Sequence, residues 1–134
     1  MSEGILIATG GDTGTFAHGK NALELQLMHS LGMSARRVLQ AATFVGWRCV
    51  RGVEWDGPDG AKRVTAQKKN MSPMGDNEIG FGCLERGFAA DIIATSGDLV
   101  GNGEKGFADA VSADKIEFVM KAGKVYKKDG KPVL

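Results

Sequence analysis

The sequence has few of the features that mark redox, metal or membrane proteins. It contains only two cysteines, Cys49 and Cys83, whose separation matches no zinc or redox motif. We expect both to be small buried apolar residues. No apolar run approaches the roughly 20 residues that cross a bilayer, and the start, MSEG, lacks the basic region of a signal peptide. A cytoplasmic protein without a membrane partner is therefore predicted.

The chain also lacks an excess of positive or negative charge. The chain has 17 Lys and Arg against 16 Asp and Glu, a formal net charge of +1 at pH 7. This balance gives no reason to expect nucleic acid as a partner. The apolar share of 43% and the charged share of 25% are ordinary for a globular protein. A length of 134 residues predicts one domain or a piece of a larger protein.

The N-terminal part predicts a strand followed by helices. Ile5–Ala8 is an unbroken apolar run, which favours a parallel strand buried on both faces, and 9–14 is a glycine-rich loop after it. A helix is predicted from Asn21, because Asn with Glu24 three residues later forms a capping box. Gly32 ends that helix and Ser34 caps a second. The predicted apolar faces are Leu23, Leu27, Met28 and Leu31, then Val38, Leu39, Ala42 and Val45.

The remaining chain divides into a polar stretch and a β unit. Residues 51–79 lack periodicity and contain a turn signal at 57–60. Trp55 is the only aromatic residue among them, which favours a solvated insertion over a basic binding patch formed by the Lys and Arg residues at 62–69. Strands are predicted at 90–95, 116–121 and 124–127. The turns that accompany them are predicted at Ala122-Gly123 and Asp129-Gly130.

Asp12 is the principal candidate for a functional residue. A carboxylate at the C-terminal end of a parallel strand lies where α/β folds place their active sites. It can coordinate a metal and accept a proton from metal-bound water, or it can cap a turn through its own side chain. His18, six residues on, is a candidate substrate or metal ligand, whereas His29 in the helix is expected to be a packed or surface residue. The GGDTG loop is also considered for phosphate, although it matches neither the P-loop nor the dinucleotide-binding pattern.

Four segments, in this order, resemble the end of the amidohydrolase superfamily barrel, closest to its imidazolonepropionase-like and prolidase-like branch. They are IATGGDTG (7–14), HGKNALELQLMHSLGMS with VLQAAT (18–34 and 38–43), GCLERGFAADIIA (82–94) and IEFVMKAGKVYK (116–127). The resemblance implies a mixed α/β fold. Residues 1–50 would be the last βα unit of a (β/α)8 barrel, 51–79 a polar insertion and 80–134 part of a small β-sandwich.

The resemblance also implies chemistry. The family hydrolyses carbon–nitrogen bonds of amide, cyclic amide or dipeptide-like substrates through water activated by one or two divalent metals, often zinc. Asp12 matches the eighth-strand Asp that binds metal and moves a proton. His18 and Asn21 match motif positions and are carried over as candidates for substrate contact.

The departures from the family are as informative as the matches. The H-x-H of the first strand, the bridging carboxylated Lys and two later His ligands have no counterpart in this chain, and Gly11 stands where the family usually has Thr. We therefore expect an incomplete barrel that is inactive alone, binds no metal tightly and self-associates through its open edge. The alternatives are a non-catalytic interaction module that retains this fold and an anion-binding α/β domain.

Overall fold

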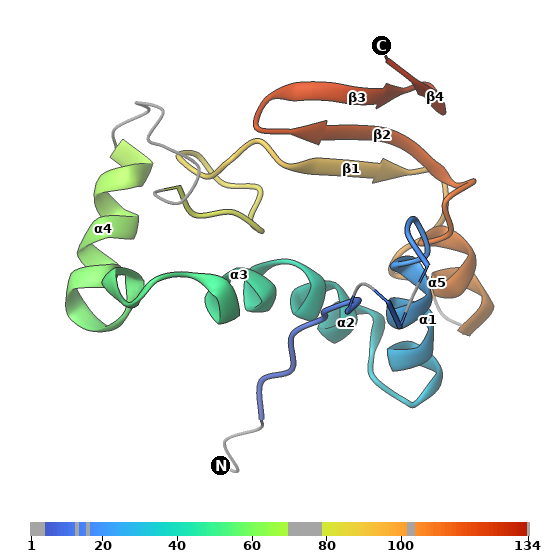
Figure 1. The fold of residues 1–134 in the computed structure, drawn as a ribbon, viewed down its shortest axis with the longest axis horizontal. Helices are drawn as coiled ribbons and strands as arrows, with labels where there is room; N and C mark the ends of the chain where they lie inside the picture. Colours follow the sequence, from blue (N-terminus) through green and yellow to red (C-terminus); the bar gives the residue numbers. More distant parts are fainter. Residues whose placement is uncertain (1–4, 13, 16, 70–78, 102–103, 134) are drawn as a thin grey trace.

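The computed structural model describes residues 5–12, 14–15, 17–69, 79–101 and 104–133. These form a mixed α/β fold in which helices α1 to α4 follow one another along one side and an antiparallel sheet lies on the other (Figure 1). The helices are α1 (Ala22–Ser30), α2 (Ala35–Ala42), α3 (Phe44–Val50), the 3-10 helix η1 (Val53–Trp55), α4 (Gly57–Lys69) and α5 (Glu104–Ala110). The strands are β1 (Ile92–Thr95), β2 (Ile116–Lys121), β3 (Lys124–Lys128) and β4 (Lys131–Pro132). Within the described residues no helix is both long enough and apolar enough to cross a bilayer.

The sheet confirms the predicted C-terminal β unit. Its strand order is β1-β2-β3-β4 and every pairing is antiparallel. Both hairpins turn on two residues with positive φ, Ala122 (49°) with Gly123 (77°), and Asp129 (50°) with Gly130 (73°). Such turns match the right-handed twist of the flanking strands, so they fix the register locally.

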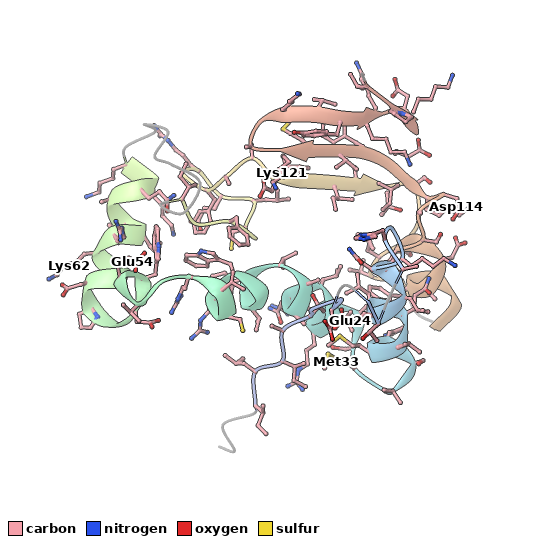
Figure 2. All side chains as sticks on the ribbon, in the orientation of Figure 1. Glu24, Met33, Glu54, Lys62, Asp114 and Lys121 are labelled. Carbon is pink, nitrogen blue, oxygen red and sulfur yellow. The ribbon has the colours of Figure 1, made fainter. Side chains whose placement is uncertain are left out.

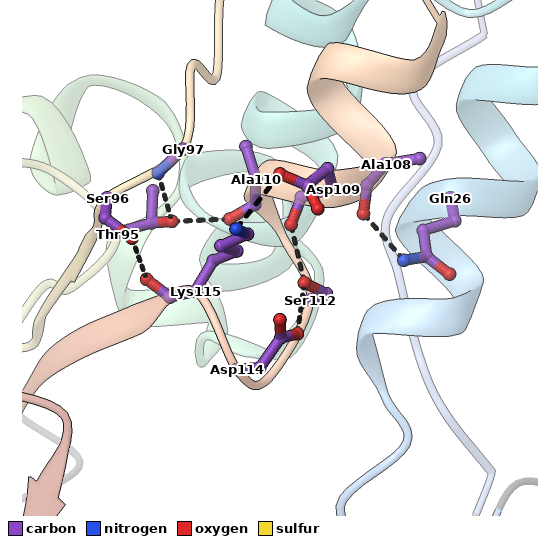
Figure 3. Close-up of polar contacts among 10 residues, drawn as sticks. All are labelled: Gln26, Thr95, Ser96, Gly97, Ala108, Asp109, Ala110, Ser112, Asp114 and Lys115. Atoms are coloured by element: carbon purple, nitrogen blue, oxygen red, sulfur yellow. Dashed lines mark hydrogen bonds and ion pairs between the residues drawn. The ribbon is translucent and has the colours of Figure 1, made fainter.

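Helix α5 joins the sheet to the N-terminal helices. The Thr95 hydroxyl at the end of β1 donates to the Ala110 carbonyl over 2.6 Å, and the Gln26 side-chain amide of α1 donates to the Ala108 carbonyl over 2.8 Å (Figure 3). Phe107 projects from the same helix into the core and is fully buried. This helix was not predicted, because glycines interrupt the segment before Phe107.

The core lies between α1, α2 and α5. Val38 and Phe107 are fully buried, and Val111 is 7% exposed. The half-buried side chains around them are Ala22, Leu25, Met28, Met33, Ala35, Leu39 and Leu99. Residues from both ends of the chain therefore share one core.

The two predicted N-terminal helices are confirmed, but their caps differ from the prediction. Gly32 follows α1 with φ 96°, the left-handed conformation that ends a helix. Neither Asn21 nor Ser34 makes a side-chain cap hydrogen bond. The Glu24 carboxylate contacts the preceding loop instead, so the capping box was a wrong prediction.

The predicted buried face of α1 was right for Met28 and wrong for the three leucines. Leu23, Leu27 and Leu31 are 41%, 47% and 87% exposed, and Leu25 and Met28 contact the core. The cause is that α1 is apolar on two sides, so periodicity alone does not select the buried one. In α2 the prediction held for Val38 and failed for Ala42, which is exposed while Ala41 is buried.

The parallel strand predicted at Ile5–Ala8 is not formed. The segment has irregular backbone, and Ile5, Leu6 and Ile7 are 91%, 61% and 48% exposed. A strand persists only where neighbours accept its backbone hydrogen bonds. In the described part of the chain no strand runs beside it, and the Thr9 N–H donates to the carbonyl of Ala41 in α2.

The stretch predicted as an aperiodic insertion contains helix α4. The turn signal at 57–60 is the start of this helix, with Pro58 in the first turn, where its missing N–H costs nothing. Gly60 is buried, and a Cβ there would lie 1.9 Å from the Trp55 carbonyl oxygen, so the close approach of α4 to η1 requires glycine. Trp55 is 4% exposed, so this region packs rather than extends into solvent. The rest of the predicted insertion, 70–78, lies outside the described residues.

Candidate functional site

Asp12 lies on an exposed turn. Its backbone φ is 37°, a left-handed value that Asp tolerates better than most residues. The Thr15 N–H donates to the Asp12 carbonyl over 2.8 Å, and the Thr15 hydroxyl lies 3.4 Å from the Asp12 carboxylate. The weak side-chain contact leaves the carboxylate open to solvent and to a ligand.

Glu24 connects the Asp12 loop to α1 by hydrogen bonding. The Gly10 N–H donates to both Glu24 carboxylate oxygens, at 3.0 and 3.1 Å. Glu24 lies where the N-terminal segment passes α1 (Figure 2). A Cβ on Gly11 would lie 3.1 Å from the Asn21 side-chain oxygen, so little room remains between them. Glycine at position 11 thus permits close approach of the loop to Asn21.

His18 and Asn21 occupy different surroundings. His18 is exposed in a turn closed by the Lys20 N–H and the Ala17 carbonyl at 3.0 Å, with Gly19 at φ 80°. Asn21 immediately precedes α1, beside the Asp12 loop. Among the described residues neither side chain hydrogen-bonds to the Asp12 carboxylate. The structure therefore brings Asn21 to the loop and leaves His18 on a separate turn.

His29 is a packed histidine, as predicted. Its Nδ1 lies 2.8 Å from the Met33 carbonyl oxygen, and its ring lies 4.8 Å from the Phe107 ring. Both contacts are within the core region, so the ring stabilises the α1–α5 packing.

The donor set around Asp12 does not fit a complete metal centre. Zinc in proteins takes three or four protein ligands from His, Cys, Asp and Glu. In the ranges that the structure describes, no three such side chains are grouped to hold an ion. Asp12 offers one exposed carboxylate, and the carboxylate of Glu24 is bound to a backbone amide.

A second site, not found from the sequence, lies between α3, η1, α4 and the 79–91 segment. Four aromatic rings meet there around Trp47, which is 3% exposed. The Trp47 ring lies 5.5 Å from Trp55 and 5.8 Å from Phe88, both edge-on, and 5.7 Å from Phe44. Such tilted arrangements are the favourable geometry for aromatic pairs. We call these four residues the aromatic cluster.

Arginines cover the aromatic cluster. The guanidinium of Arg48 lies 5.9 Å from the Phe44 ring centre, that of Arg51 lies 5.2 Å from Trp47, and that of Arg63 lies 5.0 Å from Trp55. These are cation–π distances. Three arginines and two tryptophans within residues 47–63 are the signal in the sequence that could have indicated this site.

The aromatic cluster borders an open cavity of about 690 Å³. Its polar walls include Gln40, Thr43, Arg48, Arg51, Lys68, Cys83 and Glu85. Lys68 and Glu85 form an ion pair of 2.7 Å, and Arg51 forms one with Asp56. Burial raises the pKa of the Cys83 thiol, with Glu85 acting in the same direction and Lys68 opposing. The other cysteine, Cys49, is exposed, contrary to the prediction of a buried residue.

No protein-family model, curated protein or solved structure matched this chain.

Proposed function

We propose that this chain is the C-terminal part of a metal-dependent amidohydrolase and contributes Asp12 to a divalent-metal site, zinc by resemblance, whose other ligands come from outside these residues. The observation that carries the proposal is the exposed Asp12 carboxylate on a glycine-rich loop that Glu24 holds against α1. This loop belongs to the segment that resembles the family's eighth-strand motif. In the proposal, the substrate is an amide, cyclic amide or dipeptide-like small molecule.

Exposed apolar surface near the N-terminus and on α1 supports the same proposal. Ile5, Leu6 and Ile7 form an apolar run that lacks strand partners among the described residues and is largely exposed. Adding flanking parallel strands would satisfy the backbone of this run and bury its side chains. Leu23, Leu27 and Leu31 form an exposed apolar stripe on α1, the α1 stripe, which such added structure could also cover.

The test measures zinc bound to the purified 134-residue chain after incubation and desalting. The donor set predicts much less than one zinc per chain, both for the natural sequence and for Asp12→Ala. The matched control is Asp59→Ala, which removes a carboxylate that is 89% exposed on α4. One tightly held zinc per chain that disappears in Asp12→Ala and persists in Asp59→Ala would overturn the proposal of an incomplete site.

A non-catalytic interaction module is the second candidate, and the α1 stripe is the observation that favours it. Leu23, Leu27 and Leu31 lie four residues apart, so they lie on the same side of the helix and its extension. Burying them would remove apolar surface from water at about 25 cal/mol per Å². A monodisperse dimer that melts cooperatively and dissociates in Leu27→Glu would support this candidate, while a natural chain that stays monomeric would exclude self-association through the stripe.

A further inference from the structure

The cavity beside the aromatic cluster has the size and lining of a ligand pocket. Its volume of about 690 Å³ falls within the roughly 300–1,000 Å³ typical of small-molecule sites. Phe44, Trp47, Trp55 and Phe88 supply rigid apolar walls. This region is separate from the Asp12 loop, since none of the cavity-lining residues belongs to residues 5–21.

The charges around the cavity favour an anion. Three lining side chains are cationic, Arg48, Arg51 and Lys68, and one is anionic, Glu85. Glu85 is already paired with Lys68, and Arg51 is paired with Asp56, which does not line the cavity. In the described part of the chain no carboxylate lies within ion-pair distance of Arg48. A guanidinium over an aromatic ring with no carboxylate partner is suited to receive one.

Arg51 provides a second observation. Its side chain is 14% exposed, and its Nε is buried with no hydrogen-bond acceptor among the residues described. A buried donor without an acceptor is costly, so an added acceptor on this wall would be stabilising. Because burial raises the pKa of the Cys83 thiol, this side chain stays neutral at neutral pH and adds no negative charge to the wall.

We propose that this cavity binds a small aromatic carboxylate, with the ring against the aromatic cluster and the carboxylate facing Arg48 and Arg51. The aromatic walls select a flat apolar body, and the unpaired guanidinium selects the charge at one end. Two analogues of phenylacetate separate these two requirements. Phenylacetamide lacks the charge, and cyclohexylacetate lacks the aromatic ring.

The chain's own tryptophans report binding. The sequence has two tryptophans, and both Trp47 and Trp55 line the cavity. We expect phenylacetate to change their fluorescence saturably, and phenylacetamide and cyclohexylacetate each to bind about tenfold more weakly, as the loss of one favourable contact predicts. Absence of a saturable change with phenylacetate, or equal binding of phenylacetate and phenylacetamide, would overturn the proposal.

Two variants locate the carboxylate. Arg48→Gln removes the exposed cavity guanidinium and is expected to weaken phenylacetate binding about tenfold while leaving phenylacetamide unaffected. Arg37→Gln is the matched control, because Arg37 is exposed on α2 and does not line the cavity. Equal weakening in both variants would contradict a cavity contact and indicate a general effect of charge.

The two cysteines give an independent readout. Cys83 lines the cavity, whereas Cys49 is exposed and lies outside it. Bound phenylacetate is expected to slow the alkylation of Cys83 and leave that of Cys49 unchanged, measured by mass spectrometry of the labelled peptides. Unchanged alkylation of Cys83 at a saturating concentration would place the ligand elsewhere and overturn the assignment.

Discussion

Replacing Glu24 by Ala should loosen the loop that carries Asp12. The change removes the acceptor of the Gly10 N–H and leaves α1 with a residue of higher helix propensity. The two contacts, at 3.0 and 3.1 Å, share one N–H, so they count as a single three-centre hydrogen bond. A bond to a charged acceptor contributes about 1.5–3 kcal/mol when buried. Glu24 is half-buried and Gly10 is exposed, which lowers our value to about 1 kcal/mol.

This free energy translates into a measurable local opening. A loss of about 1 kcal/mol raises the open fraction of the loop about fivefold, so hydrogen exchange at the Gly10 amide should accelerate by that factor. The measurement is hydrogen exchange of this amide followed by nuclear magnetic resonance. Glu24→Gln keeps one acceptor oxygen and should recover most of the protection. The exposed-carboxylate variant Asp59→Ala should leave Gly10 unaffected. Unchanged Gly10 exchange in a folded Glu24→Ala chain would refute the proposed role of Glu24.

Three further changes test the packing. Phe107→Ala should lower the free energy of unfolding by about 3–5 kcal/mol in urea titrations, since the ring is fully buried, and a loss below about 1 kcal/mol would contradict the α5 core. Gly60→Ala should lower the melting temperature, because a Cβ would lie 1.9 Å from the Trp55 carbonyl oxygen, and an unchanged melting temperature would refute this contact. Cys83 should alkylate more slowly than exposed Cys49 near pH 8, because the raised pKa of Cys83 lowers its thiolate fraction. The raised pKa also predicts that the free energy of unfolding falls as pH rises above the pKa of the thiol in the unfolded chain. Faster alkylation of Cys83 than of Cys49 would contradict the raised pKa on which both expectations depend.

The C-terminal β unit could be predicted because its signals are local. Strand β2 has the bounds expected from the sequence, and the pairs Ala122-Gly123 and Asp129-Gly130 form the two predicted turns. A two-residue turn specifies the pairing of the strands beside it without help from distant residues. The same holds for Gly32, whose positive φ ends α1 where expected.

The features that could not be predicted depend on distant contacts. The buried side of α1 is decided by Phe107, about 80 residues away, and not by the helix's own pattern. The 57–60 segment is compatible with a turn or a helix start, and packing against Trp55 decides between them. The run 5–8 matches a buried strand, yet it forms none without strand partners.

The candidate site divides in the same way. Asp12 and its glycine-rich loop were recognisable from sequence because the residue types and their order are local features. The use of Glu24 as an anchor was not, since Asn21 and Glu24 also satisfy the pattern of a capping box. The aromatic cluster brings together residues between positions 44 and 88. Hydrophobic periodicity describes single helices and strands, so it could not predict contacts between residues this far apart.

The most direct test of the proposed function is to extend the chain into the coding sequence upstream of Met1 and measure zinc and amide hydrolysis in the resulting protein. We predict that this sequence contains an H-x-H after an apolar strand, and that the continuous protein binds at least one zinc. Asp12→Ala should abolish hydrolysis, whereas Asp59→Ala should leave zinc content and hydrolysis intact. An upstream sequence without H-x-H, or an Asp12→Ala protein that retains full activity, would contradict the assignment of Asp12 as a ligand of an amidohydrolase metal site.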